Sequence, residues 1–266
     1  MDNSYPPTRP QFAIIIPACD EEACIGHVLE ELCATVDTDK FVVAVGVNGS
    51  SDKTAEVARA HGALVAETVQ RGYGHGCQSA IDLVAGILPP MRAYIFLAGD
   101  GASDPQDVRK LVDAYEQGYA FVLGARTSQL GNWRVMRFSH VIANFALALW
   151  CGLLAGRWFR DLAPLRLIDR RLFEAIAPRE NTYGWTIEPQ IGAARLGAAI
   201  CEVPASERPR LAGQQKVSGV TWGRTFIIGC RIVAAGFRAR LRFRRAANRE
   251  FDRPEKELVA EPQRGS

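Results

Sequence analysis

The apolar positions of this chain alternate between short continuous runs and stretches in which they recur about once per helical turn. Short apolar runs bounded by polar residues or glycine are typical of buried strands, and helical spacing is typical of amphipathic helices. The predicted strands cover residues 12–16, 41–47, 63–67, 93–98 and 120–126. The predicted helices cover residues 21–36, 51–62, 74–88 and 105–118.

Repeated strand and helix units of this length predict an α/β fold with a mainly parallel, doubly wound sheet flanked by helices. Ligands of such sheets bind beyond the carboxyl ends of the strands. Four polar turns should therefore meet along one rim of the sheet, although they are far apart in the sequence. These turns are residues 17–22, 47–52, 99–104 and 124–128.

The pattern changes after residue 126. Residues 140–156 are almost continuously apolar but short and rich in small residues, so we interpret them as a buried or interfacial helix instead of a membrane span. Residues 220–245 begin apolar and lead into closely spaced arginines. Such a segment is typical of a helix at an anionic bilayer surface or of a solvated terminal helix, and both interpretations stay open.

Composition limits the class of protein. The 266 residues are 48% hydrophobic, which suffices for a large core in one main domain. The net charge of only +3 argues against a dedicated nucleic-acid binder. The seven cysteines are scattered and never spaced as CxxC, so we expect neither a disulfide framework nor a zinc site, and a reducing cytosol is the simpler setting. The polar, proline-rich start predicts no secretory signal.

The fourth predicted strand ends in "AYIFLAGDGASDP", where a carboxylate, Asp100, follows the apolar run. Metal sites at this place commonly use two acids, and the position two residues upstream is Ala98. One carboxylate suffices for magnesium when phosphate oxygens and water complete the shell. The alternative is that Asp100 caps the following helix.

Three cations accompany this aspartate at predicted loops. Arg126 follows the fifth strand, and Arg210 and Lys216 lie in a glycine-containing segment. Guanidinium and ammonium groups beside a strand-end carboxylate suit a ligand with several negative charges, such as a diphosphate. The alternative for Arg126 is an ion pair with a surface carboxylate.

The order of the motifs along the chain is more specific than any one of them. They read "IIIPACDEEACIGHVLEEL", "VNGSSDKTAEVARAHGA", "RGYGHGCQSAI", "FLAGDGASDP", "LGARTS", "RDLAPLRLIDRRLF", "TYGWTIEPQIGAARLGAAICEVP" and "RPRLAGQQKVSG". Together they resemble family-two glycosyltransferases of the GT-A fold, above all the dolichol-phosphate mannose synthase-like branch and its bacterial relatives. The resemblance implies a GT-A domain over residues 11–235, after a disordered lead (1–10) and before a basic amphipathic segment and disordered tail (236–266).

The resemblance also implies a donor site with Mg²⁺ or Mn²⁺ as cofactor. The implied donor-binding positions are Pro17, Cys19, Glu21, Asn48, Gly99, Arg126, Arg210 and Lys216, with the metal on Asp100. The chain departs from the family pattern at three of the motif positions. Cys19 replaces a tyrosine, Val47 replaces a base-contacting acid, and Ala98 replaces the first acid of the DxD motif. The positions implied to bind the phosphates of the donor are thus retained, while those implied to bind its nucleotide base, which we call the base side, are altered.

On the acceptor side, the resemblance places Asp161 and Arg166 near the sugar and the acceptor. Glu188 occupies the place of a general base, and burial beside Trp185 is expected to raise its pKa. The alternative is that Glu188 pairs with a nearby arginine, and a lipid phosphate acceptor needs no base at all. His75, in a glycine-rich loop, is more typical of a helix start or a donor pocket than of a catalytic residue.

These observations predict an inverting sugar transfer from a UDP- or GDP-linked donor to a membrane lipid such as a polyprenyl phosphate. The expected location is cytoplasmic, peripherally on the inner face of the membrane, with no nucleic-acid partner. One alternative is a non-catalytic member of the fold that binds a nucleotide or a lipid. A nucleotidyltransferase fits less well, because its first loop is usually glycine-rich and basic, and residues 17–22 are acidic here.

Overall fold

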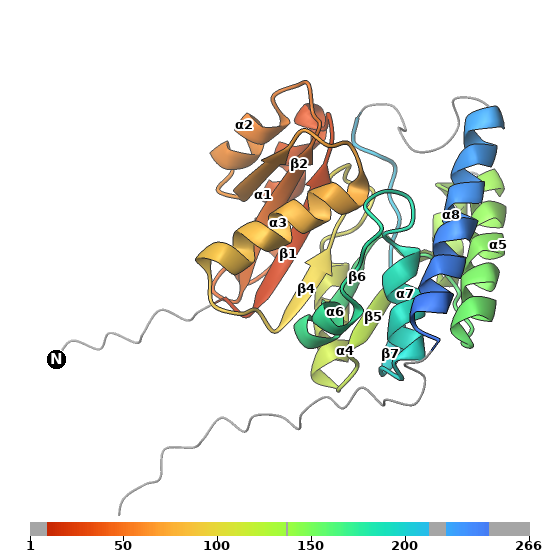
Figure 1. Ribbon diagram of the computed structural model, residues 1–266. Coiled ribbons are helices and arrows are strands. Elements are labelled where there is room, and N and C mark those ends of the chain that lie inside the picture. The colour runs from red at the N-terminus through yellow and green to blue at the C-terminus, as the bar shows by residue number, and fades with distance from the viewer. Residues whose placement is uncertain (1–9, 137, 213–221, 245–266) are drawn as a thin grey trace, which may run out of the picture.

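A seven-stranded sheet with the strand order β3-β2-β1-β4-β6-β5-β7 forms the centre of the molecule (Figure 1). The computed structural model describes residues 10–136, 138–212 and 222–244. The strands are β1 (Phe12–Ala18), β2 (Phe41–Asn48), β3 (Leu64–Thr68), β4 (Ala93–Phe96), β5 (Phe121–Ala125), β6 (Arg166–Asp169) and β7 (Ile200–Pro204). The helices are α1 (Glu22–Thr35), α2 (Thr54–Ala60), α3 (Tyr73–Ile87), α4 (Asp107–Glu116), α5 (Phe138–Ala155), α6 (Arg170–Ile176), α7 (Ile187–Arg195) and α8 (Trp222–Arg242), with short 3₁₀ turns η1 (Arg126–Ser128) and η2 (Leu130–Arg134).

The first half of the sheet is parallel and covered on both faces, as the sequence predicts. β1 pairs in parallel with β2 and with β4, and β2 pairs in parallel with β3. Side chains of β1 alternate between two cores: Ile14 and Ile16 pack with α1, α2 and α4, whereas Ala13 and Ile15 pack with α3, α6 and α7. Because both faces are buried, the strand is a continuous apolar run.

The second half of the sheet differs from the expectation. β6 lies antiparallel between β4 and β5, and β7 pairs in parallel with β5 at the edge. The apolar pattern after residue 126 predicts neither strand. β6 is only four residues long and begins with a buried arginine, so its own sequence carries little strand signal.

Two loops at the carboxyl ends of β1 and β2 are tied together by Asp52. Its carboxylate accepts backbone hydrogen bonds from Thr54, at the start of α2, and from Glu22, at the start of α1. Helix α2 begins at Thr54, later than the predicted residue 51, and its N-cap position is Lys53. It ends before Gly62, whose φ of 79° suits a glycine there.

Helices α5 and α8 pack with α7 at the end of the sheet beyond β7 (Figure 1). The predicted helix over residues 140–156 is confirmed as α5, and it is only partly buried, since Leu153 stays 64% exposed. α8 is one continuous helix, so the predicted boundary at residue 235 falls inside it. Among the described residues no helix combines the length and the apolar character needed to span a bilayer. The predicted lead and most of the predicted tail lie outside the described residues.

Candidate functional site

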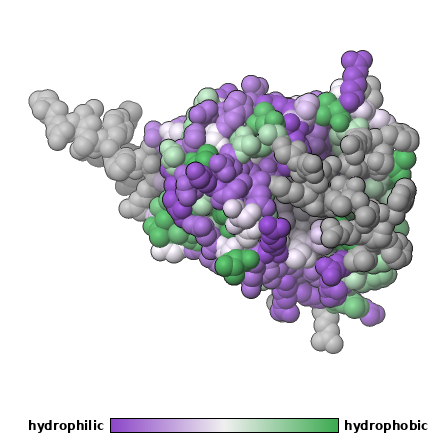
Figure 2. All heavy atoms as spheres, turned by 90° about the horizontal axis from the view of Figure 1, so that it is seen from above, coloured by the Kyte–Doolittle hydropathy of each residue, from purple (hydrophilic) through white to green (hydrophobic). Residues whose placement is uncertain are grey.

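The carboxyl ends of the parallel strands form a polar rim at the top of Figure 1, and Figure 2 looks onto this rim. The described surface there is mainly hydrophilic (Figure 2). The loop after β4 runs beside the segment after β7: the Arg208 backbone N–H donates to the Ala102 carbonyl at 2.8 Å, and that of Leu211 donates to the Asp100 carbonyl at 3.2 Å. Residues that are about a hundred positions apart are thereby held together.

Asp100 and Arg210 are in direct contact at the rim. Arg210 Nη1 lies 3.2 Å from Asp100 Oδ2, and its Nη2 donates to Glu21 Oε1 at 2.9 Å. Asp100 Oδ1 accepts the backbone N–H of Ala102. The alternative that Asp100 caps α4 is wrong, because Asp104 accepts the N–H that precedes this helix. Arg210 thus bridges two rim loops. Lys216 lies outside the described residues.

Arg126 is held by a buried carboxylate. Its Nε and Nη2 donate to Asp161 Oδ2 and Oδ1 at 3.0 and 2.9 Å, and its backbone N–H donates to Oδ2 as well. Burial lowers the pKa of Arg126, but the charge and hydrogen bonds of Asp161 and Glu207 raise the pKa above its ordinary value. The guanidinium therefore stays charged. That Asp161 lies near the sugar and the acceptor stays a prediction, and its fully buried side chain holds Arg126.

Glu207 is a rim residue that the sequence analysis did not identify. Its Oε1 lies 3.4 Å from Arg126 Nη1, and among the described residues its buried Oε2 has no hydrogen-bond partner. Burial raises the pKa of Glu207 to about 7, with the charge of Arg126 opposing and the charges of Asp100 and Asp161 adding. Glu207 lies three residues after β7, and the sequence analysis did not predict this strand.

The predicted base-side residues gather at the adjacent ends of β1, β2 and β4. Pro17 and Asn48 lie under the start of α3: a Cβ on Gly76 would come within 3.0 Å of Pro17 Cβ and 2.8 Å of Asn48 Oδ1. A Cβ on Gly99 would lie 3.3 Å from Ile16 Cγ2, so this glycine packs on β1. These contacts pack the start of α3 and the loop after β4 closely against β1 and β2, beneath the polar groups of the rim.

Two further residues join the base-side loops and have no counterpart in the predicted set. Asp20 adopts a φ of 51° and accepts the Ser51 backbone N–H at 2.6 Å. Arg71 donates to Asp20 Oδ2 at 3.2 Å and to the Gly49 carbonyl at 3.1 Å. Cys19 Sγ lies 3.9 Å from the same carbonyl. The loops after β1, β2 and β3 are therefore linked by the Asp20–Arg71 ion pair.

The acceptor-side expectations need two corrections. Glu188 is buried, but Oε2 accepts the N–H groups of Arg179 and Glu180, and Oε1 pairs with Arg242 at 2.7 Å. Its surroundings are thus polar, and the arginine-pairing alternative is confirmed. Arg166 is also fully buried and donates to the carbonyls of Thr186 and Ala163, so it supports loops instead of facing a ligand. Burial lowers the pKa of Arg166.

His75 lies in the first turn of α3, which fits the helix-start interpretation. Its backbone N–H donates to the Asn181 carbonyl at 3.2 Å. This contact joins the first turn of α3 to the loop before α7. The contact that the structure shows for His75 is therefore a structural one.

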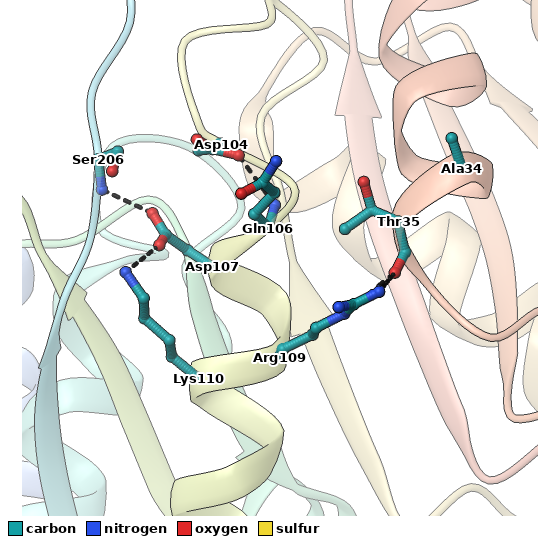
Figure 3. A pocket seen from close by; sticks show the side chains of 8 residues that line it. All are labelled: Ala34, Thr35, Asp104, Gln106, Asp107, Arg109, Lys110 and Ser206. Carbon is teal, nitrogen blue, oxygen red and sulfur yellow. Dashed lines mark hydrogen bonds and ion pairs between the residues drawn. The ribbon is translucent and has the colours of Figure 1, made fainter.

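A cavity of about 380 Å³ lies between α1, α4 and the segment after β7 (Figure 3). In Figure 3 the Asp107 carboxylate lies between Lys110 and the backbone of Ser206, accepting from both at 2.6 Å. Arg109 donates to the Thr35 carbonyl. None of the predicted site residues lines this cavity, and its polar groups satisfy one another. The hydrogen bond between Ser206 and Asp107 connects α4 to the segment that carries Glu207 and Arg210.

The sequence of the chain is similar to those of known proteins. The family model described as Glycosyl transferase family 2 matches residues 13–173. A dolichyl-phosphate hexose transferase of Haloferax volcanii is 32% identical over 237 residues, covering 88% of this chain and 98% of that protein. An uncharacterized glycosyltransferase of Mycobacterium tuberculosis is 30% identical over 209 residues, covering 77% and 89%.

A solved structure extends the likeness to the fold. Glucosyl-3-phosphoglycerate synthase from Mycobacterium tuberculosis, in complex with Mn²⁺, UDP and glucosyl-3-phosphoglycerate, superposes with a TM-score of 0.64 at 22% identity. The match covers 86% of this chain and 80% of the synthase chain. The predicted GT-A fold is confirmed.

Proposed function

Because the chain belongs to glycosyl transferase family 2 and is thus a glycosyltransferase, we propose that it transfers a sugar from a nucleotide-sugar donor to a lipid phosphate, with inversion. The dolichyl-phosphate relative supports a polyprenyl phosphate as the acceptor. The single observation that carries the proposal is the convergence of Arg126, Arg210 and Asp100 at one rim.

The two arginines would bind the diphosphate of the donor. Arg126 is fixed by Asp161 and needs no rearrangement, which is the preorganisation that electrostatic stabilisation requires. Arg210 is partly exposed, and its two terminal nitrogens pair with Glu21 and Asp100. A phosphate of the donor can replace these carboxylates as the acceptor. We expect Lys216 to add a third positive charge.

Among the described residues no group of three or more histidine, cysteine, aspartate or glutamate side chains could hold a metal ion, so a divalent cation at the rim would also need oxygens of the donor as ligands. In the described part of the rim, four carboxylates contact two guanidinium groups, which leaves an excess of negative charge and of oxygen donors. These carboxylates are Glu21, Asp100, Asp161 and Glu207. Hard cations such as Mg²⁺ and Mn²⁺ prefer oxygen ligands. We propose that Asp100 holds the ion, which would offset the charge of the diphosphate when bound.

The proposed reaction needs little acid–base chemistry from the protein. An oxygen of the lipid phosphate forms a bond to C1 of the sugar, while the bond from C1 to the diphosphate breaks and its electron pair leaves with the nucleoside diphosphate. The attacking phosphate oxygen is already ionised. A general base is therefore unnecessary, which agrees with the full engagement of Glu188 in structural contacts.

A non-catalytic, ligand-binding role is the second candidate. The observation in its favour is the loss of three family positions, at Cys19, Val47 and Ala98. A transfer assay separates the two candidates: purified protein, a panel of UDP- and GDP-sugars, Mn²⁺ and a polyprenyl phosphate, with the product identified by mass spectrometry. A glycosylated lipid phosphate supports the proposed transfer.

The matched pair for this assay is Asp100→Asn and Asp39→Asn. Asp39 is exposed in the turn before β2 and takes no part in the rim. We expect Asp100→Asn to lower the rate by about 10²-fold or more, as for the loss of one electrostatic contact to a leaving group, and Asp39→Asn to match the wild type. Transfer that survives in Asp100→Asn at the wild-type rate would remove Asp100 from the mechanism.

A further inference from the structure

Helices α5 and α8 expose a row of large apolar side chains on the outside of the molecule. On α5 these side chains recur every three or four residues, so they share one face of the helix. On α8 two of them are separated by one turn. We call the set the α5–α8 face, and it consists of Ile142, Phe145, Leu149, Leu153, Phe237 and Leu241.

The two rows form one continuous surface. The Trp150 ring on α5 lies 4.8 Å from the Phe237 ring on α8, edge to face. Arg240 on α8 donates to the carbonyls of Leu153 and Leu154 at the end of α5. Both helices lie side by side at the edge of the molecule beyond α7 (Figure 1). An object docking there would contact both helices at once.

The charge around this face has one sign. Residues 138–155 and 222–244 contain no aspartate and no glutamate, whereas residues 222–244 contain six arginines. Arg238 pairs with Glu180, and Arg242 pairs with Glu188. The other described arginine side chains of this segment have no carboxylate partner among the described residues: Arg231, Arg240 and Arg244. Within the described part of the chain, the apolar row is therefore accompanied by arginines that lack a carboxylate partner.

We propose that the α5–α8 face docks on an anionic lipid bilayer. Apolar side chains would enter the interface while the arginines meet lipid phosphates. Trp158, which follows α5 and is 60% exposed, is the residue type that prefers this interface. A second copy of the chain fits less well, because an isologous contact would oppose arginines to arginines without acids between them. The inference builds on the proposed lipid acceptor, but it concerns binding alone.

The test is flotation of the full chain with vesicles of phosphatidylcholine, with or without phosphatidylglycerol. The apolar variant carries Leu149→Ser, Leu153→Ser and Leu241→Ser, and its matched control carries Val69→Ser and Ile87→Ser, which are exposed elsewhere. We expect wild type and control to bind the anionic vesicles and the apolar variant to bind them at least about tenfold more weakly. Since all five side chains are exposed, circular dichroism should report the same fold for each protein.

A second variant tests the contribution of the arginines to vesicle binding. Arg231→Gln with Arg244→Gln should weaken binding to the anionic vesicles by about fivefold for each arginine removed, and Arg171→Gln, on the exposed side of α6, should not. Higher salt should weaken wild-type binding in the same direction. Light scattering on the same samples reports the oligomeric state.

Three results would overturn the proposal: a wild type that ignores anionic vesicles, an apolar variant that floats like the wild type, or a wild-type dimer that only the apolar variant dissociates. The outcome is independent of catalysis. Vesicle binding without sugar transfer would leave the docking surface standing while the proposed function fails, and transfer to a soluble short-chain acceptor without vesicle binding would do the reverse.

Discussion

The two rim arginines are held by carboxylates in different ways. Asp161 is fully buried and gives both oxygens to Arg126, whereas Arg210 is partly exposed and divides its contacts between Glu21 and Asp100. A buried, bidentate pair fixes one guanidinium in place, while an exposed pair exchanges partners easily. The guanidinium of Arg126 is thus held in one position before a ligand binds, whereas that of Arg210 can exchange its carboxylate partners for a ligand.

Removing the partner of Arg126 should be costly. In Asp161→Ala the buried guanidinium of Arg126 loses its bidentate carboxylate partner with two hydrogen bonds, and the Arg126 backbone N–H loses a third, while Glu207 remains nearby. We therefore expect the free energy of unfolding to fall by about 3–5 kcal/mol. Urea denaturation measures the change, and Asp39→Ala is the control. A loss no larger than that of the control would mean that Asp161 does not position Arg126.

Glu207 should make stability depend on pH. Its folded pKa of about 7 lies above the unfolded value, so the protonated form stabilises the fold at low pH, and this stabilisation is lost as the pH rises toward and through 7. Between pH 5 and pH 8 the metal-free wild type should lose about 1–3 kcal/mol relative to Glu207→Gln, which cannot ionise. Equal pH profiles of unfolding for the two proteins would contradict the assignment.

At the scale of elements, the packing beneath the rim depends on how closely α3 approaches β2. Gly76 is the contact point, because a Cβ there would come within 2.8 Å of the Gly46 carbonyl and of Asn48 Oδ1. Backbone and a buried amide cannot yield as a flexible side chain can. The glycine-rich start of α3 therefore sets the distance between the helix and the sheet.

Gly76→Ala should therefore destabilise the protein by about 1–3 kcal/mol, the usual cost of overpacking, and weaken nucleotide binding. Gly86, in the same helix, is the matched control, because a Cβ there meets no atom within 4 Å. Gly86→Ala should be neutral or stabilising by up to about 1 kcal/mol. Thermal unfolding of the two variants compares them directly, and equal effects would show that close packing at Gly76 is unimportant.

The elements also show which signals the sequence carries. The strands β1 to β5 are predictable because each is an apolar run between turn residues, although β3, at the edge of the sheet, is only partly buried. β6 and β7 are not, since β6 is short, antiparallel and started by a buried arginine, and β7 is a half-buried edge strand. Glu207 was missed for that reason. The roles of Asp161 and Glu188 depended on partners far away in the sequence, Arg126 and Arg242.

At the scale of the whole molecule, the chain divides its tasks between the two ends of the sheet. The parallel half, β1 to β4, carries the positions proposed to bind the nucleotide base and the metal, and β5 and β7 bring Arg126, Glu207 and Arg210 to the same rim. The far edge carries α5, α8 and the proposed docking surface (Figure 1). In the proposed arrangement, a lipid acceptor would reach the site from the side of α5 and α8, and the donor would bind at the rim.

The most direct test of the proposed donor site is calorimetric titration of UDP and GDP, with and without Mn²⁺, into the wild type, Asp100→Asn and Asp39→Asn. We predict that one nucleotide binds the wild type and Asp39→Asn in the presence of Mn²⁺, and that omitting Mn²⁺ or replacing Asp100 weakens binding by about tenfold or more. If neither nucleotide binds, or if Asp100→Asn binds as tightly as the wild type, the rim is not the metal-assisted nucleotide-sugar site described above.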